Sequence, residues 1–200
     1  MTKELFDSNT KGKIVDTAID LFYKNGYHAT GMREIAKHLG ITVSNLYNYF
    51  TGKSELLFFI MEHVMRKLID GVQMEIESRE DPLAQLRSAI HFHIFFHGNH
   101  QKAAWVTDNE LRGLEGEMFQ HILGLRDQYE SIYVKILENA ISNDQIEPLN
   151  TKLIAYAILN MCTGVTYWYR ADRPLTLQNI TDKYFLLLIN GLGLRNKENC

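Results

Sequence analysis

Residues 29–53, ATGMREIAKHLGITVSNLYNYFTGK, constrain the fold of this chain more than any other stretch. The apolar residues of its first half recur at helical spacing: Met32, Ile35, Ala36 and Leu39. They predict a short helix that Thr30 caps and that Gly40 ends, because glycine tolerates the positive φ of many helix ends. Thr42 is then placed to cap a second short helix over residues 43–50. The stretch therefore predicts two short helices that meet at a tight corner, a helix-turn-helix.

The second of these helices is predicted to have one buried and one exposed face. Its inward positions are Leu46, Tyr49 and Phe50, and its outer positions are Val43, Ser44, Asn45, Tyr47 and Asn48. Small, amide and hydroxyl side chains on an exposed helix suit contact with base edges and phosphates in the major groove of DNA. An ordinary helical hairpin with a polar surface is the alternative. Two helices this short are not stable alone, however, and their length matches the DNA-binding unit.

The distribution of charge favours local DNA contact at this end of the chain. The net charge is −3, yet residues 1–53 contain 7 Lys and Arg against 5 Asp and Glu, whereas residues 54–200 contain 14 against 19. A slightly basic N-terminal part joined to an acidic body is compatible with binding at one place on DNA. The overall negative charge argues against a protein that coats nucleic acid indiscriminately.

The remaining periodic segments also predict α-helices. They cover residues 10–25, with Asn9 or Thr10 as the cap, and residues 54–79, 83–96, 102–117, 118–141, 150–169 and 176–193. With 46% apolar residues, 3 Pro and 13 Gly, the composition is that of an ordinary globular protein. We therefore expect an all-α fold with a three-helix helix-turn-helix domain over residues 1–53 and a helical body over residues 54–200.

The last two helices of the body are too apolar to remain in water. Residues 150–169 and 176–193 together exceed what a small helical body needs to bury. Pairing with the same helices of a second copy, as a four-helix bundle, would cover them. We therefore expect a homodimer.

Neither a membrane nor an oxidising compartment is indicated. The N-terminus, MTKELFDSNTKGK, lacks an apolar core with a cleavage site, and no window approaches the roughly 18 to 20 apolar residues of a membrane span. Cys162 and Cys200 lie far apart and form no CxxC pair, so reduced thiols are expected. We expect a cytoplasmic protein without a membrane partner.

The segment AIDLFYKNGYHATGMREIAKHLGITVSNLYNYFTGKSELL closely resembles the N-terminal signature of the TetR family of one-component transcriptional regulators, with the resemblance extending over residues 14–57. It implies an all-helical homodimer that binds a palindromic operator in double-stranded DNA. It also implies release from DNA when a small molecule enters the C-terminal domain, so residues 54–200 become a ligand-binding and dimerisation domain.

The resemblance also implies roles for particular residues at the DNA surface. It gives Thr42 as a cap that touches phosphate, and it assigns base or phosphate contacts to Asn45, Tyr47 and Asn48. It places a phosphate-binding lysine at Lys53 and puts Thr30 and Arg33 at the start of the helix that crosses the DNA backbone. This chain has Val43 and Ser44 where many relatives have a cation and a glycine, which removes one charge from the recognition helix.

The C-terminal half is similar to the branch of the family that senses acyl-CoA thioesters, through NELRGLEGEMFQHILGLRDQYESIY and TGVTYWYRADRPLTLQNITDKYFLLLINGL. By resemblance, Trp168, Arg170 and Arg173 would meet the adenine and phosphates, and Arg112 or Arg126 would line the passage. Such a ligand also needs an apolar tunnel. Residues of suitable type are Phe92, Phe95, Phe96, Trp105, Val106, Met118, Ile122, Met161 and Tyr167. Core packing is the alternative role for each of them.

Four histidines between residues 91 and 100 and the absence of enzyme motifs bear on two further functional classes. His93, His97 and His100 follow helical spacing beside His91, which is the pattern of a metal-sensing site. However, Gly98 and Asn99 are expected to end the helix before His100, and structural histidines are commoner than metal ligands.

The chain contains no GxGxxG, P-loop, GxSxG or HExxH motif, and an apolar helix around Cys162 would leave its thiol unreactive. We therefore expect no enzyme activity, metal or cofactor. The remaining alternatives are a helical sensor or adaptor without operator binding, and a regulator of drug efflux that responds to hydrophobic compounds.

Overall fold

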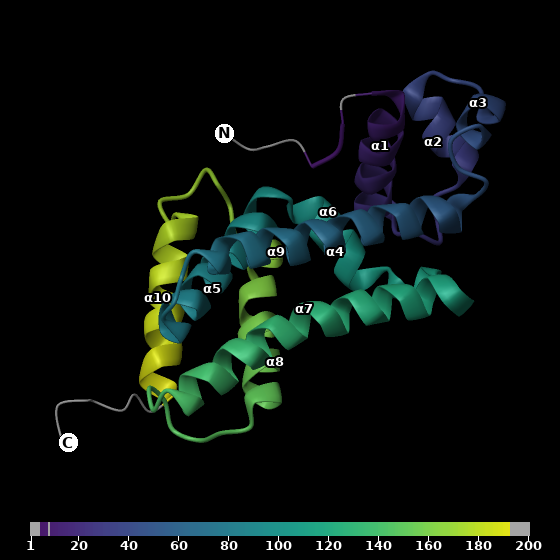
Figure 1. Ribbon diagram of the computed structural model, residues 1–200. Helices are drawn as coiled ribbons and strands as arrows, with labels where there is room; N and C mark the ends of the chain where they lie inside the picture. Colours follow the sequence, from purple (N-terminus) through teal and green to yellow (C-terminus); the bar gives the residue numbers. More distant parts are fainter. Residues whose placement is uncertain (1–4, 8, 193–200) are drawn as a thin grey trace. The chain divides into compact units, whose positions relative to one another are not determined.

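The computed structural model describes residues 5–7 and 9–192, and every regular element in these residues is helical (Figure 1). They form ten α-helices and one 3-10 helix, which confirms the predicted all-α class. No helix among them is long and apolar enough to cross a membrane. The chain divides into two compact units, unit 1 with residues 1–66 and 100–125 and unit 2 with residues 67–99 and 126–200.

Unit 1 brings the N-terminal helices together with a segment from the middle of the chain. Its elements are α1 (Thr10–Asn25), α2 (Met32–Leu39), α3 (Val43–Tyr47), the first half of α4 (Lys53–Glu77), α6 (Gln101–Asn109), the 3-10 helix η1 (Leu111–Gly113) and the first part of α7 (Gly116–Ser142). Asn9 is the cap of α1, since its Oδ1 accepts a hydrogen bond from the Gly12 amide at 2.9 Å. The predicted helix over residues 102–117 is interrupted after Asn109, where η1 follows.

The core of unit 1 is formed by apolar side chains that its helices direct inward. Fully buried side chains of α1 to α4 include Ile14, Phe22, Ile35, Leu46, Leu56 and Leu57. Burying a Leu or Phe contributes roughly 1.5–3 kcal/mol relative to leaving it exposed. Leu46 therefore fixes the short α3 helix to the rest of the unit and leaves its other face outward.

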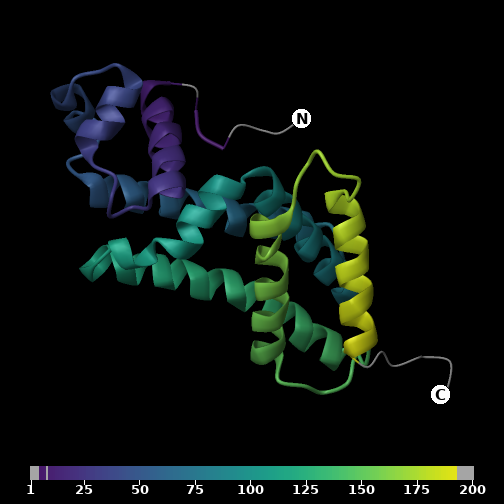
Figure 2. The same ribbon diagram turned by 180° about the vertical axis from the view of Figure 1, so that it is seen from behind.

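Unit 2 contains the second half of α4, the rest of α7 and four further helices: α5 (Pro82–Asn99), α8 (Thr151–Thr163), α9 (Val165–Trp168) and α10 (Leu177–Gly191). Helix α5 packs against both α8 and α10 and lies between them (Figure 2). Thr176 caps α10, in a reciprocal capping box with Asn179.

Two predicted helix boundaries of unit 2 were wrong. Gly98 does not interrupt α5, which continues to Asn99. A Cβ atom at Gly98 would lie 2.4 Å from Cδ2 of Leu177, so this glycine serves the close approach of α10. Residues 150–169 do not form one helix, because α8 ends at Thr163 and a separate turn, α9, follows Gly164. Cys162 is buried, and burial raises the pKa of its thiol to about 12, whereas Cys200 lies outside the described residues.

Candidate nucleic-acid interface

The corner between α2 and α3 has the predicted local geometry. Gly40 adopts φ 66° and ψ 26°, the left-handed region, and its amide donates to the carbonyl oxygens of Ala36 and Lys37. The hydroxyl of Thr42 accepts a hydrogen bond from the Asn45 amide at 3.2 Å, which caps α3. Both predictions are confirmed, and together they place α3 directly after a sharp turn.

The outer face of α3 presents the residues predicted to approach DNA. Ser44, Asn45, Tyr47 and Asn48 are exposed and Val43 is half-buried, while Leu46 has no exposed surface. Tyr47 keeps 48% of its surface exposed, although an aromatic side chain of this size is commonly covered. The face thus offers amide, phenol and hydroxyl side chains, which are groups of the kind that contact base edges and phosphates.

The C-terminal end of this helix differs from the prediction. Helix α3 ends at Tyr47, with Asn48 as its C-cap, rather than at residue 50. Tyr49 was predicted to face inward and instead has 38% of its surface exposed. Phe50 is buried as predicted, because the turn after Asn48 directs its ring against Phe59, with the ring centroids 5.5 Å apart.

Thr30 is buried in the loop before α2 and does not cap this helix. Gly31 is the N-cap of α2 and makes no side-chain cap, so the prediction of a Thr30 cap was wrong. Thr30 is 1% exposed, and its hydroxyl lies 3.0 Å from the carbonyl oxygen of Gly26 and 3.3 Å from that of Leu21. Those contacts hold the loop between α1 and α2 and turn the side chain away from solvent. Arg33, by contrast, is exposed on α2.

Lys53 directs its ammonium group into the protein. Its Nζ donates to the carbonyl oxygens of Tyr27 at 2.7 Å, Thr30 at 2.9 Å and His28 at 3.3 Å. Burial lowers the pKa of this ammonium, and the nearby charge of Glu110 acts in the opposite direction. All three N–H groups are used within the domain, so the geometry does not present Lys53 as the phosphate-binding residue that the resemblance implied.

The residues predicted to bind an effector are divided between the two units. Trp105, Arg112, Met118 and Ile122 belong to unit 1, whereas Phe92, Phe96, Arg126, Met161, Tyr167, Trp168, Arg170 and Arg173 belong to unit 2. Several have packing roles. Trp105 lies edge-on to Tyr23 of α1, with the ring centroids 5.3 Å apart, and Ile122 has no exposed surface. Phe92 occupies the space beside Gly71, where a Cβ atom would lie 2.1 Å from its ring.

The stretch after α8 keeps its predicted ligand-binding residues accessible. Tyr167 is 51% exposed and Trp168 is 44% exposed, and both Arg170 and Arg173 are exposed. The Arg170 guanidinium donates only to the neighbouring Tyr169 carbonyl in the contacts that the structure describes for it, at 2.9 Å. An exposed indole and two exposed cations thus lie within six residues of one another in the sequence, and these are the side-chain types that bind an aromatic base and phosphate.

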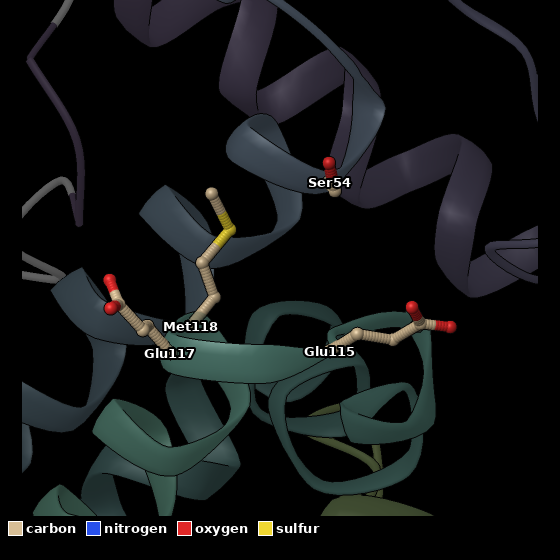
Figure 3. Close-up of a pocket in the computed structure, with 5 residues that line it drawn as sticks. Ser54, Glu115, Glu117 and Met118 are labelled. Carbon is tan, nitrogen blue, oxygen red and sulfur yellow. The ribbon is translucent and has the colours of Figure 1, made fainter.

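A pocket of about 450 Å³ in unit 1 is lined by Ser54, Gly113, Glu115, Glu117 and Met118 (Figure 3). Met118 points toward α4, while the carboxylates of Glu115 and Glu117 point away from each other. Their charge would repel the phosphates of a CoA ester, and their orientation does not bring two carboxylates onto one ligand. The pocket therefore offers no anion site.

The buried histidines of α5 form a polar cluster in the core of unit 2. The Nδ1 atom of His93 lies 3.0 Å from the Tyr129 hydroxyl, and its Nε2 atom lies 3.0 Å from the Thr163 hydroxyl. The His97 ring stacks on His93 with the centroids 4.0 Å apart. Burial lowers the pKa of both rings, to about 4 for His97. No three His, Cys, Asp or Glu side chains within residues 5–7 and 9–192 gather closely enough to hold a metal ion.

Comparison with known families gives matches to both halves of the chain. The model described as "Bacterial regulatory proteins, tetR family" matches residues 14–59, and the model "Tetracyclin repressor-like, C-terminal domain" matches residues 79–192.

Individual relatives match over nearly their whole length. The fatty acid metabolism regulator protein of Bacillus subtilis (strain 168) is 27% identical over 182 residues, which span 90% of this chain and 94% of that protein. The structure of AibR in complex with isovaleryl coenzyme A and operator DNA has a TM-score of 0.83 at 25% identity, over 90% of this chain and 98% of that one. The structure of the ketosteroid regulator KstR2 of Mycobacterium tuberculosis has a TM-score of 0.87 at 22% identity, over 96% and 98%, which shows the shared fold.

Proposed function

Because this chain belongs to the tetR family of bacterial regulatory proteins, we propose that it is a homodimeric transcriptional repressor that binds a palindromic operator and is released by an acyl-CoA effector. The observation that carries the DNA-binding part is the α2–α3 corner, where a capped and firmly anchored α3 turns Asn45 and Tyr47 outward. Since the operator is chromosomal DNA, the proposal includes a cytoplasmic location.

Within this proposal, α3 enters the major groove and reads bases through Asn45 and Tyr47. Ser44, Asn48, Thr42 and Arg33 lie at the edges of this face, where they would contact phosphates or neighbouring bases. Thr30 and Lys53 hold the domain together and take no part in the contact. Two copies of α3 in a dimer would be separated by about one turn of DNA, roughly 34–36 Å.

The dimer is proposed to form through α8 and α10. Both helices carry large apolar side chains that remain exposed in the single chain: Leu153 and Tyr156 on α8, and Leu186 and Leu187 on α10. Leu187 and Leu153 are each more than 60% exposed. A four-helix bundle made from α8, α10 and their copies would remove these side chains from water.

The effector is proposed to be a CoA thioester because AibR, whose fold this chain shares over 90% of its own length, has been solved in complex with isovaleryl coenzyme A. Trp168, Arg170 and Arg173 would bind the nucleotide end, since they combine an indole with two exposed cations. Trp105 is left out of this set, because its ring packs on α1. The effector weakens operator binding by binding more tightly to the form of the dimer that does not fit the operator than to the form that does. The size of the effect equals the difference between these two affinities.

Operator binding is tested by selecting fragments of genomic DNA on the purified dimer and measuring their affinity by fluorescence anisotropy over a range of salt concentrations. We expect sequence-selective and salt-dependent binding. Asn45→Ala combined with Tyr47→Ala should abolish the selectivity, and Gln73→Ala, which removes an exposed amide from α4, should not. Absence of selective binding by the wild-type dimer would mean that the chain is a sensor or adaptor.

Effector identity is tested on the operator complex with isovaleryl-CoA, palmitoyl-CoA, free CoA and the hydrophobic dye ethidium. The proposal expects release by at least one acyl-CoA. Substituting Arg170 and Arg173 by Gln should raise the acyl-CoA concentration needed for release without changing operator affinity. Release by ethidium but by neither acyl-CoA would support the drug-responsive alternative instead.

A further inference from the structure

The loop between α1 and α2 is held on two sides by groups of opposite charge. On one side, the Lys53 ammonium group donates hydrogen bonds to three loop carbonyls, including that of Tyr27. On the other side, the Glu110 carboxylate accepts a hydrogen bond from the Tyr27 amide at 3.0 Å. The backbone of one residue is therefore fixed at its N–H by an anion and at its C=O by a cation.

The side chain of Tyr27 is fixed by the same neighbours. Tyr27 is 6% exposed, and the Lys53 ammonium lies 4.2 Å from the centroid of its ring. A Cβ atom at Gly113 would lie 2.6 Å from the ring, so the backbone of η1 rests directly on Tyr27. Glu110 and Gly113 belong to one turn, since the Gly113 amide donates to the Glu110 carbonyl at 2.8 Å.

This turn connects α6 to the beginning of α7, whereas Tyr27 immediately precedes the helix-turn-helix. Helix α6 itself is attached along α1 by the Lys102–Asp20 ion pair at 2.6 Å and by the Trp105–Tyr23 ring contact. Those two contacts engage the body of α1. The Glu110–Tyr27 contact instead reaches the loop from which α2 starts, so a shift of the turn acts on the helix-turn-helix itself.

We propose that Glu110 is a positioning residue that transmits the position of the α6–α7 turn to the helix-turn-helix, through the Tyr27 backbone that it shares with Lys53. This inference rests on the proposed function, because it concerns the same operator-binding surface. With Glu110 bound, the loop holds α2 and α3 in one orientation. Without it, the turn no longer constrains that orientation, and changes in the effector-binding body reach α3 less completely.

The inference is tested with three variants of the full chain. Glu110→Ala removes the acceptor, Glu110→Gln keeps an oxygen that can accept from the Tyr27 amide, and Glu115→Ala is the control. Glu115 also acts electrostatically on Tyr27, but the bond to the Tyr27 amide comes from Glu110. Hydrogen exchange of residues 26–31 measures the contact, and operator anisotropy measures its effect.

We expect faster exchange of residues 26–31 in Glu110→Ala and operator binding weakened by about threefold or more, with most of the affinity restored in Glu110→Gln. The ratio of operator affinities without and with isovaleryl-CoA or palmitoyl-CoA should decrease toward one in Glu110→Ala only. Exchange in α8 and α10 should not change, which separates a local effect from general destabilisation.

If amide hydrogen exchange of residues 26–31 is as slow in Glu110→Ala as in wild type, the inference is overturned, whether or not the protein binds DNA. Equal operator affinity of Glu110→Ala and wild type, or an equal loss in Glu115→Ala, also overturns it. A wild-type dimer that binds no operator refutes the proposed function, and the exchange measurement then still decides whether Glu110 holds the loop.

Discussion

Replacing Lys53 by methionine should destabilise the protein rather than remove a DNA contact. Methionine keeps most of the apolar stem beside the Tyr27 ring but leaves three loop carbonyls without the ammonium group. The bonds to Tyr27 at 2.7 Å and Thr30 at 2.9 Å are short, whereas the bond to His28 at 3.3 Å is long and lies at an exposed residue.

The size of the effect follows from the two short bonds. A hydrogen bond from a charged group contributes about 1.5–3 kcal/mol, but Lys53 is half-buried and water can partly replace it, so about 1 kcal/mol per bond is appropriate. The free energy of unfolding should therefore decrease by about 2 kcal/mol. For a chain of this size that corresponds to a decrease in Tm of about 4–8 °C.

Thermal and urea unfolding, followed by circular dichroism at matched protein concentration, measure this change, because the stability of a dimer depends on concentration. Lys67→Met, which removes an exposed cation from the same helix, should leave Tm nearly unchanged. The dependence of operator affinity on salt should keep its slope in Lys53→Met. Wild-type stability together with a slope reduced by about one per lost phosphate contact would show that Lys53 binds DNA, and the structural reasoning would be wrong.

Three further predictions concern other parts of the fold. Gly40→Ala places a side chain at φ 66° and should lower the free energy of unfolding by about 1 kcal/mol in urea titrations; an unchanged midpoint would contradict this. Leu187→Asp should shift the dimer toward monomer, as measured by light scattering. Met74→Asp, which changes an even more exposed apolar residue on α4, should leave the dimer intact. Equal masses for both variants would exclude α10 from the interface. The pKa of His97 is lowered to about 4, so the unfolded state takes up its proton first as the pH falls below about 6.5. His97 alone should therefore lower stability by about 2 kcal/mol at about pH 5, and His93, whose pKa is also lowered, adds to this loss. His97→Gln should flatten this part of the pH profile, and a profile identical to wild type would show that another group is responsible.

Local chemistry was enough to predict the DNA-binding corner from the sequence. The left-handed Gly40 and the Thr42 cap depend on neighbours within about four residues, because caps and turns are closed by short-range hydrogen bonds. The inward position of Leu46 follows from the 3.6-residue period of the helix. The same reasoning identified the all-α class.

The tertiary structure decided where long side chains end and which segments meet. Lys53 carries a charge that suits phosphate, yet its ammonium binds carbonyls 23 to 26 positions earlier in the chain. Trp105 is apolar enough for a ligand tunnel, yet it packs on Tyr23, and Glu110 reaches an amide 83 positions away. No periodic pattern contains these pairings, because they depend on which surfaces of distant helices come together when the apolar faces are buried. The sequence by itself thus determined the helices and the local shape of the helix-turn-helix corner, whereas the folded chain determined which side chains of the corner are exposed and which hold it in place.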